Sequence, residues 1–153
     1  MQYDEGSVGR IFALRFEHGE RLPDAIEDFA RNQGVRSAMI VLLGGAGDGS
    51  RLVVGPEEDG DDVIIPLVFA LKGTQEIMAV GTIFPDEQGN PILHMHGATG
   101  REGDATVGCT RAGVDVWLIG EAILLEINGI RGLRKKDPKT GFQLLQLPRE
   151  DVS

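Results

Sequence analysis

The sequence predicts an α+β domain, a mainly antiparallel β-sheet with one long helix early in the chain. Runs rich in Val, Ile and Leu recur along its 153 residues, and turn residues separate them, including many of the 22 glycines. Only one stretch, near the start, spaces its apolar residues at the period of a helix. Strand runs that accompany a single helix are typical of the α+β class.

The first two elements are expected to be a strand and this helix. Residues 10–16 alternate imperfectly between apolar and polar side chains, which predicts a strand. Residues 22–30 carry apolar side chains at positions 22, 25, 26, 29 and 30, which form one stripe along a helix. Pro23 suits the first helical turn, and Gly34 suits the end of the helix.

The rest of the chain is predicted to form strands. Glycines interrupt residues 43–49, but no Gly-Lys-Ser/Thr ending and no helix follow them. We therefore interpret them as a turn or bulge rather than a phosphate-binding loop. An acidic turn is expected at 57–62. The expected strands cover residues 38–43, 52–54, 64–71, 76–83, 92–96, 114–119, 121–127 and 142–147.

Length and charge limit the classes of function. The sequence contains no linker or repeat, so residues 1–153 are predicted to form a single domain. The formal net charge is -9. Proteins bind nucleic acid largely by neutralising phosphates with Lys and Arg, and an acidic surface repels phosphate. Direct binding of nucleic acid is therefore not expected.

The cysteine count and the lengths of the apolar runs indicate the cellular location of the protein. Cys109 is the single cysteine, so the chain forms no internal disulfide and nothing points to an oxidising compartment. Residues 1–5 carry acids and no apolar signal core, and the apolar runs are too short to span a bilayer. We expect a cytoplasmic protein with no membrane partner.

Several segments, taken in order, match the pattern of a known family. They read HGERLPDAIEDFARNQGV, MIVLLGGAGDGSRL, LKGTQEIMAVGTIFPDEQGNPILHMHGATG, VGCT, GEAILLEI and RKKDPKTGFQLL. On these segments, residues 8–147 resemble the stand-alone prokaryotic form of the plants-and-prokaryotes conserved (PPC) domain. The resemblance implies an α/β-sandwich-like protomer that assembles as a homotrimer. Plant members add an AT-hook for DNA binding, whose Arg-Gly-Arg-Pro pattern residues 131–134 lack.

His94 and His96 are the most suggestive pair for metal binding. Alternate residues of a strand point to the same face, so both imidazoles can converge on one ion. The family resemblance implies a third histidine at the position of Cys109, and a thiolate is also a good zinc ligand. The three residues predict a divalent-metal, zinc-like site with one open position. Alternatively, the histidines face solvent while Leu93 and Met95 face the core, and Cys109 is a small buried hydrophobe.

Three further residues are candidates for catalysis. The resemblance places acids at Glu76 and Glu121, where a carboxylate could orient an imidazole or act as a general base. Arg15 in the first strand could pair with one of them through two hydrogen bonds. Alternatively, the two acids are ordinary carboxylates at strand edges and Arg15 faces solvent.

Two functions from different classes remain open on the sequence alone. The first is a trimeric metal-binding protein with a small-molecule pocket, acting as a metal-dependent hydrolase or lyase. The second is a non-catalytic trimeric scaffold or regulator, whose contact with DNA is indirect. Neither the substrate nor the occurrence of catalysis follows from the residues.

Overall fold

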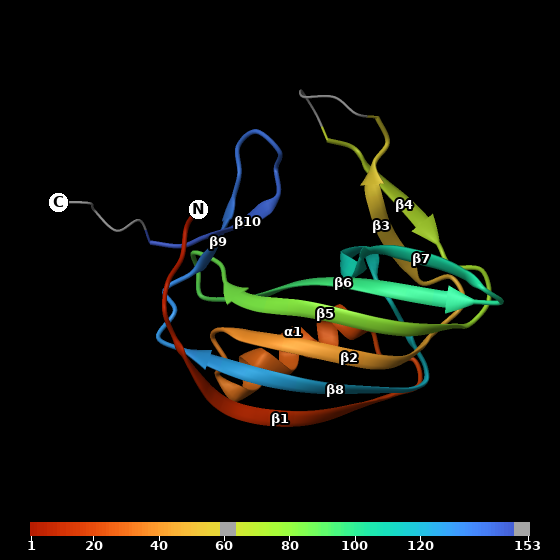
Figure 1. Cartoon of the computed structure of the whole chain (residues 1–153), viewed down its shortest axis with the longest axis horizontal. Coiled ribbons are helices and arrows are strands. Elements are labelled where there is room, and N and C mark those ends of the chain that lie inside the picture. Colours follow the sequence, from red (N-terminus) through yellow and green to blue (C-terminus); the bar gives the residue numbers. More distant parts are fainter. Residues whose placement is uncertain (59–63, 149–153) are drawn as a thin grey trace.

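The computed structural model describes residues 1–58 and 64–148, which form a large and a small antiparallel sheet, an α-helix and a short 3-10 turn (Figure 1). The large sheet has the strand order β1-β8-β2-β5-β6-β7-β3-β4, and β9 pairs with β10 in the small one. The elements are β1 (Ser7–Glu17), α1 (Leu22–Gln33), β2 (Ala38–Ala46), β3 (Arg51–Pro56), β4 (Pro66–Ala70), β5 (Gln75–Pro85), β6 (Pro91–Arg101), β7 (Asp104–Cys109), η1 (Thr110–Ala112), β8 (Val116–Asn128), β9 (Leu133–Lys136) and β10 (Gln143–Gln146).

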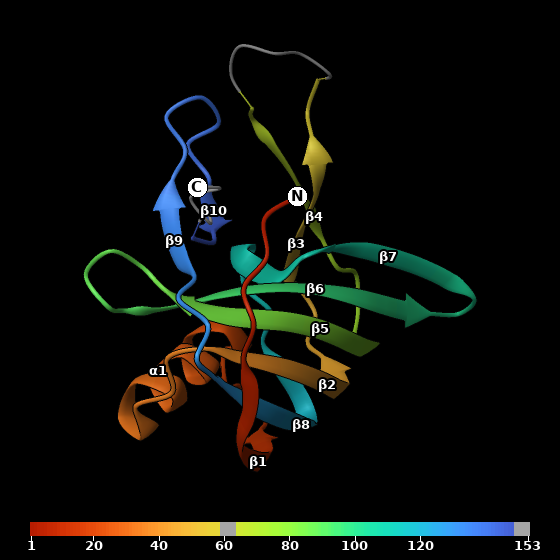
Figure 2. The ribbon, with the colours of Figure 1, turned by 60° about the vertical axis from the view of Figure 1, so that its left-hand side comes forward.

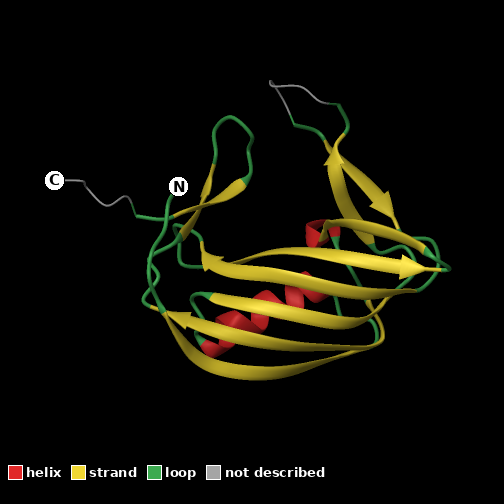
Figure 3. Cartoon of the chain, viewed as in Figure 1, coloured by secondary structure: helices red, strands yellow, loops and turns green. Residues whose placement is uncertain are grey.

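Helix α1 covers one face of the large sheet (Figures 2 and 3). Its apolar stripe packs inward, with Leu22, Ile26 and Ala30 almost fully buried. Gly34 ends the helix in the left-handed conformation, with a φ of 65°, as its position in the sequence predicts. The side chains that point from the sheet towards α1 complete the core; they include Ile40, Leu42, Ile77, Ala79, Met95 and Leu124.

The opposite face of the sheet is also apolar but is exposed. We call it the open face, and it includes Met39, Val41, Leu43, Met78, Val80 and Ile123. Exposure is 71% for Met78 and 53% for Val80, although both lie in the central strand β5. Side chains of a strand alternate between faces, so apolar residues on both faces explain why these strands read as unbroken apolar runs.

The predicted fold class is confirmed, whereas several element boundaries differ from the expectation. Residues 114–119 and 121–127 were expected as two strands, but 116–128 form the single long strand β8. Strands β7 and β9 were not expected, because β7 is short and half polar and β9 carries a run of basic residues. The acidic turn expected at 57–62 lies mostly outside the described residues.

Two hairpins lie on the same side of strands β5 and β6 (Figures 1 and 2), and residues beside both of them line a pocket. The first joins β3 and β4, and the second joins β9 and β10. Lining residues of the pocket come from β3, from residue 64, from Pro66 at the start of β4, and from Phe142 just before β10. Strands β6 and β7 and the 3-10 turn η1 contribute the remaining wall, and the candidate site lies there. Within the described part of the chain, no helix is long and apolar enough to cross a membrane.

Candidate metal centre

Strand β6 presents His94 and His96 together on the open face. Their neighbours across β5 are Thr82 and Val80, and Met95 between them is buried in the core at 1% exposure. The two imidazole rings meet edge to face with centroids 5.0 Å apart, and their Nε2 atoms are 3.2 Å apart. The alternation of the strand therefore brings two metal-ligating nitrogens to one point, as the sequence predicts.

The β6–β7 hairpin adds Cys109 to this pair. Cys109 lies directly opposite His96 in the antiparallel register, and residues so paired point to the same face of the sheet. One ligand atom from each of His94, His96 and Cys109 lies within 4.8 Å of the other two. Cys109 is buried at 3% exposure, whereas both histidines remain partly open to solvent.

The geometry of the three ligands fits a zinc-like ion. Two nitrogens bound at about 2.0–2.1 Å in a tetrahedral arrangement lie about 3.3–3.4 Å apart. The observed 3.2 Å between the two Nε2 atoms is close to that separation. Two imidazoles and a thiolate are ligands that zinc accepts, and three protein ligands leave one position open.

The surroundings keep both imidazoles in the form that binds metal. Partial burial lowers the pKa of His94, and the nearby charges of Arg134 and Arg111 lower it further. Burial also lowers the pKa of His96, together with the charges of His94 and Arg111. A metal ligand must be an unprotonated imidazole, so these lowered pKa values favour ligation at neutral pH.

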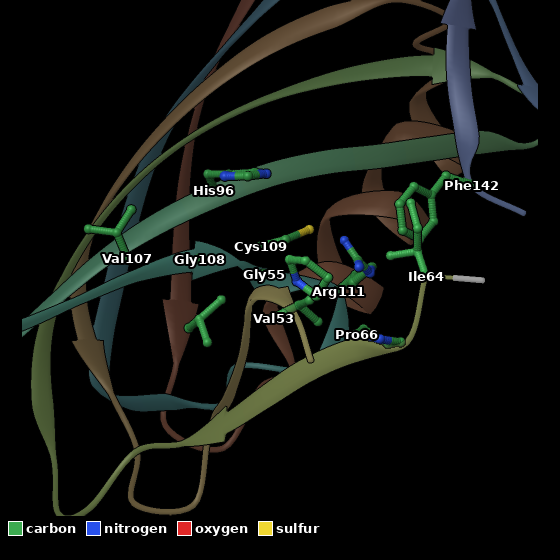
Figure 4. A pocket seen from close by; sticks show the side chains of 12 residues that line it. Val53, Gly55, Ile64, Pro66, His96, Val107, Gly108, Cys109, Arg111 and Phe142 are labelled. Atoms are coloured by element: carbon green, nitrogen blue, oxygen red, sulfur yellow. The ribbon is translucent and has the colours of Figure 1, made fainter. Parts of the chain in front are cut away.

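A pocket of about 710 Å³ adjoins the triad (Figure 4). His96 and Cys109 form part of its wall, and Figure 4 shows the Arg111 guanidinium and the Phe142 ring around the same space. This volume is in the usual range for small-molecule sites. The other lining residues are mainly apolar; they are Val53, Val54, Gly55, Pro56, Ile64, Pro66, Val107 and Gly108.

Sequence reasoning missed two arginines at this site. Arg134 belongs to the basic run 134–136, yet it is buried at 4% exposure and donates a hydrogen bond to Thr82 Oγ1 at 2.9 Å. Burial lowers the pKa of Arg134, and the charge of Cys109 opposes that shift. Arg111 follows Cys109 by two residues and lies over the Phe142 ring, 5.2 Å from its centroid. Only the fold, which buries Arg134 and brings both arginines near the triad, distinguishes them from surface basic residues.

The structure does not bring the three other candidates to the triad. Glu76 lies four residues along β5 from Val80, the partner of His96, which corresponds to about 13 Å. Glu121 is in β8, and β2 and β5 separate that strand from β6. Arg15 lies opposite Glu121 across β1 and β8, but its ion pair is with Glu17. Arg15 and Glu121 line a separate hollow on the sheet, and no triad residue lines it.

Comparison with known proteins decides the family. The sequence pattern of the Plants and Prokaryotes Conserved domain matches residues 3–128, which is most of the chain. The chain belongs to the PPC domain family. No curated protein sequence matches it.

Several solved structures share the fold over most of the chain. A PPC protein from Pyrococcus horikoshii is 25% identical and has a TM-score of 0.82, with 98% of this chain and 100% of that chain covered. A protein from Archaeoglobus fulgidus described as metal-containing is 25% identical, with a TM-score of 0.80 and coverage of 95% and 99%. A protein from Ralstonia eutropha, provisionally named as DNA-binding, is 24% identical with a TM-score of 0.68 and coverage of 89% and 90%.

Proposed function

We propose that this PPC protein binds one divalent ion, zinc, through His94, His96 and Cys109, and acts as a metal-dependent hydrolase or lyase on a small molecule in the adjoining pocket. The observation that carries the proposal is the convergence of three ligand atoms within 4.8 Å at the pocket wall. The description of the A. fulgidus relative as metal-containing supports it.

The chain's own residues would hold the ion and shield the reaction. When bound, such an ion supplies a Lewis acid and an activated water at neutral pH. Cys109 is buried at the inner side of the triad, while the imidazoles approach from the more open side. A substrate bound against the mainly apolar pocket wall would displace water from it, which strengthens electrostatic interactions with that substrate.

We also propose that the chain assembles as a homotrimer through the open face. Six large apolar side chains on this face are between 37% and 71% exposed, a patch that a lone protomer leaves in water. His96 and Val107 line a shallow hollow there together with Val41, Met78 and Val80. A neighbouring protomer on this face would therefore lie next to the metal centre.

A non-catalytic trimeric regulator is the second candidate function. The provisional name of the R. eutropha relative favours it, because that name concerns DNA. The net charge of -9 makes direct contact with DNA unfavourable, so the contact would pass through a protein partner.

Metal analysis of the purified protein tests the primary proposal. The chain is expressed without an affinity tag and the metal content per protomer is measured by mass spectrometry. We expect about one zinc per protomer, and less than a tenth of that in the double variant His94→Ala, His96→Ala. The matched control is His18→Ala, which removes the third histidine in the turn after β1 and leaves the metal content unchanged. A wild-type protein that neither contains zinc nor takes it up would favour the regulator.

A further inference from the structure

The metal centre has an excess of positive charge. Arg134 and Arg111 both lower the pKa of His94, and Arg134 interacts electrostatically with Cys109. Among the described residues, neither guanidinium has a carboxylate partner: Arg134 bonds to the Thr82 hydroxyl and Arg111 lies on an aromatic ring. A divalent ion outweighs one thiolate, so loading the site with metal increases the positive charge further.

Arg134 makes this imbalance costly. Its residue exposure is 4%, and its Nε is buried with no hydrogen-bond partner among the described residues. A buried charge is strongly disfavoured unless an opposite charge is close. Arg134 does not line the adjoining pocket, but an anion there would add negative charge beside Cys109, whose own charge already acts on Arg134.

Arg111 is placed to bind such an anion. It lines the pocket together with His96 and Cys109. Its guanidinium lies over the face of Phe142, 5.2 Å from the ring centroid, and this packing holds the side chain. A guanidinium carries its N–H donors in its own plane, as a fork that matches the two oxygens of a carboxylate.

The rest of the pocket indicates that the body of the ligand is apolar. Its walls are largely aliphatic or aromatic, with Val53, Val54, Ile64, Val107 and Phe142 among the lining side chains. Such walls favour an apolar group and offer few further donors. A phosphate dianion needs more donors than one exposed guanidinium supplies, whereas a carboxylate is satisfied by a single fork.

We infer that the pocket binds a small carboxylate with an apolar body, with its carboxylate on Arg111 and the body against the apolar walls. This inference names the substrate class of the proposed metal centre and therefore rests on the proposed function. It assigns Arg111 as a binding residue and Arg134 as the source of a positive field that favours an anion there.

Binding of hexanoate, followed by NMR amide shifts of the full chain, tests the inference. Wild-type protein is titrated as purified and again after removal of metal with a chelator, and the Gly55 and Gly108 amides report on the pocket wall. We expect hexanoate to bind metal-free protein with a dissociation constant of about 1 mM. Hexanol, which has the same apolar body without the charge, should bind at least about tenfold more weakly, as should inorganic phosphate.

Variants of two arginines complete the experiment. Arg111→Met should weaken hexanoate binding by at least about tenfold, and Arg111→Lys, which keeps the charge but loses the fork, should weaken it less. Arg36→Met is the matched control, because Arg36 is exposed and does not line the pocket. It should bind hexanoate like the wild type.

The outcomes separate this inference from the proposed function. Equal binding of hexanoate and hexanol, no effect of Arg111→Met, tighter binding of phosphate, or no hexanoate binding in either form would each overturn the inference. Hexanoate binding that needs Arg111 in a protein that takes up no zinc would leave the anion site standing and refute the metal-dependent function. Zinc uptake without hexanoate binding would overturn the inference and leave the proposed metal-dependent function standing.

Discussion

Met95 and His96 are neighbours in β6 whose side chains lie on opposite faces of the sheet, and substitutions on the two faces should act differently. Met95 is 1% exposed and packs in the core under α1. Truncating a buried Met to Ala removes apolar contacts and leaves a cavity, so Met95→Ala should lower the free energy of unfolding by about 2–5 kcal/mol. The double variant His94→Ala, His96→Ala alters exposed side chains and should change metal-free stability by only about 0.5 kcal/mol.

Zinc should bring the two losses of stability close together, because only the double variant misses the stabilisation that the bound ion provides. Zinc at about 100 times its dissociation constant stabilises a binding-competent fold by about 2.7 kcal/mol. That increment should appear in the wild type and in Met95→Ala, which keeps all three ligands, and should be absent from the double variant. Urea unfolding with and without zinc measures it, at one fixed protomer concentration because assembly also contributes to stability. A double variant that is stabilised by zinc, or that loses as much metal-free stability as Met95→Ala, would refute the assignment of faces.

Four other predictions follow from the charges and the open face. Metal affinity should fall as the pH drops from 7 to 4, because both imidazoles and the Cys109 thiol must lose their protons to bind metal. The fall should be steepest, more than about tenfold per pH unit, below pH 6.5, because both imidazole pKa values are lowered from 6.5. Competition with a coloured chelator measures this, and a flat profile over that range would contradict it. Hydrogen bonds from Arg10 hold the pKa of Glu126 at about 2, below the ordinary 4.5, so their stabilisation is present above pH 4.5 and is lost as the pH falls towards 2. Urea midpoints should therefore fall more steeply over that range in the wild type than in Glu126→Gln, and equal slopes would count against the pair. Light scattering should give a mass of three times 16.5 kDa for the wild type. The variant Val41→Asp, which places a charge on the open face, should give a smaller mass. A monomeric wild type would refute the trimer proposal. Random and AT-rich DNA duplexes should show no binding at physiological salt, and a dissociation constant below about 10⁻⁶ M would contradict this.

Local patterns in the sequence were sufficient for most of the fold. The stripe at 22, 25, 26, 29 and 30, with Gly34 after it, predicts α1 because a helix repeats every 3.6 residues and glycine tolerates the left-handed conformation at its end. His94 and His96 lie on one face because side chains two residues apart in a strand point to the same side of the sheet. Strands β7 and β9 could not be predicted this way, because they are short and polar and gain their stability from pairing with neighbours.

The rest of the site was decided by tertiary structure. Cys109 reaches the histidines because the β6–β7 turn, with Glu102 and Gly103 at positive φ, sets a register in which Cys109 faces His96. Arg134 is brought to the triad by the placement of β9 beside β5.

Strand order and register also explain why Glu76 and Glu121 do not join the triad. Being in a strand determines which face a carboxylate occupies, but its distance from a site depends on strand order and register. The order β8-β2-β5-β6 puts two strands between Glu121 and the histidines. The sequence by itself therefore determined the fold class, α1, most of the strands and the shared face of the two candidate ligands His94 and His96. Cys109 was a candidate ligand on the family resemblance, but long-range strand pairing alone decided its closeness to the histidines. The same pairing decided the placement of the two arginines and the pocket, because these contacts join residues far apart in the chain.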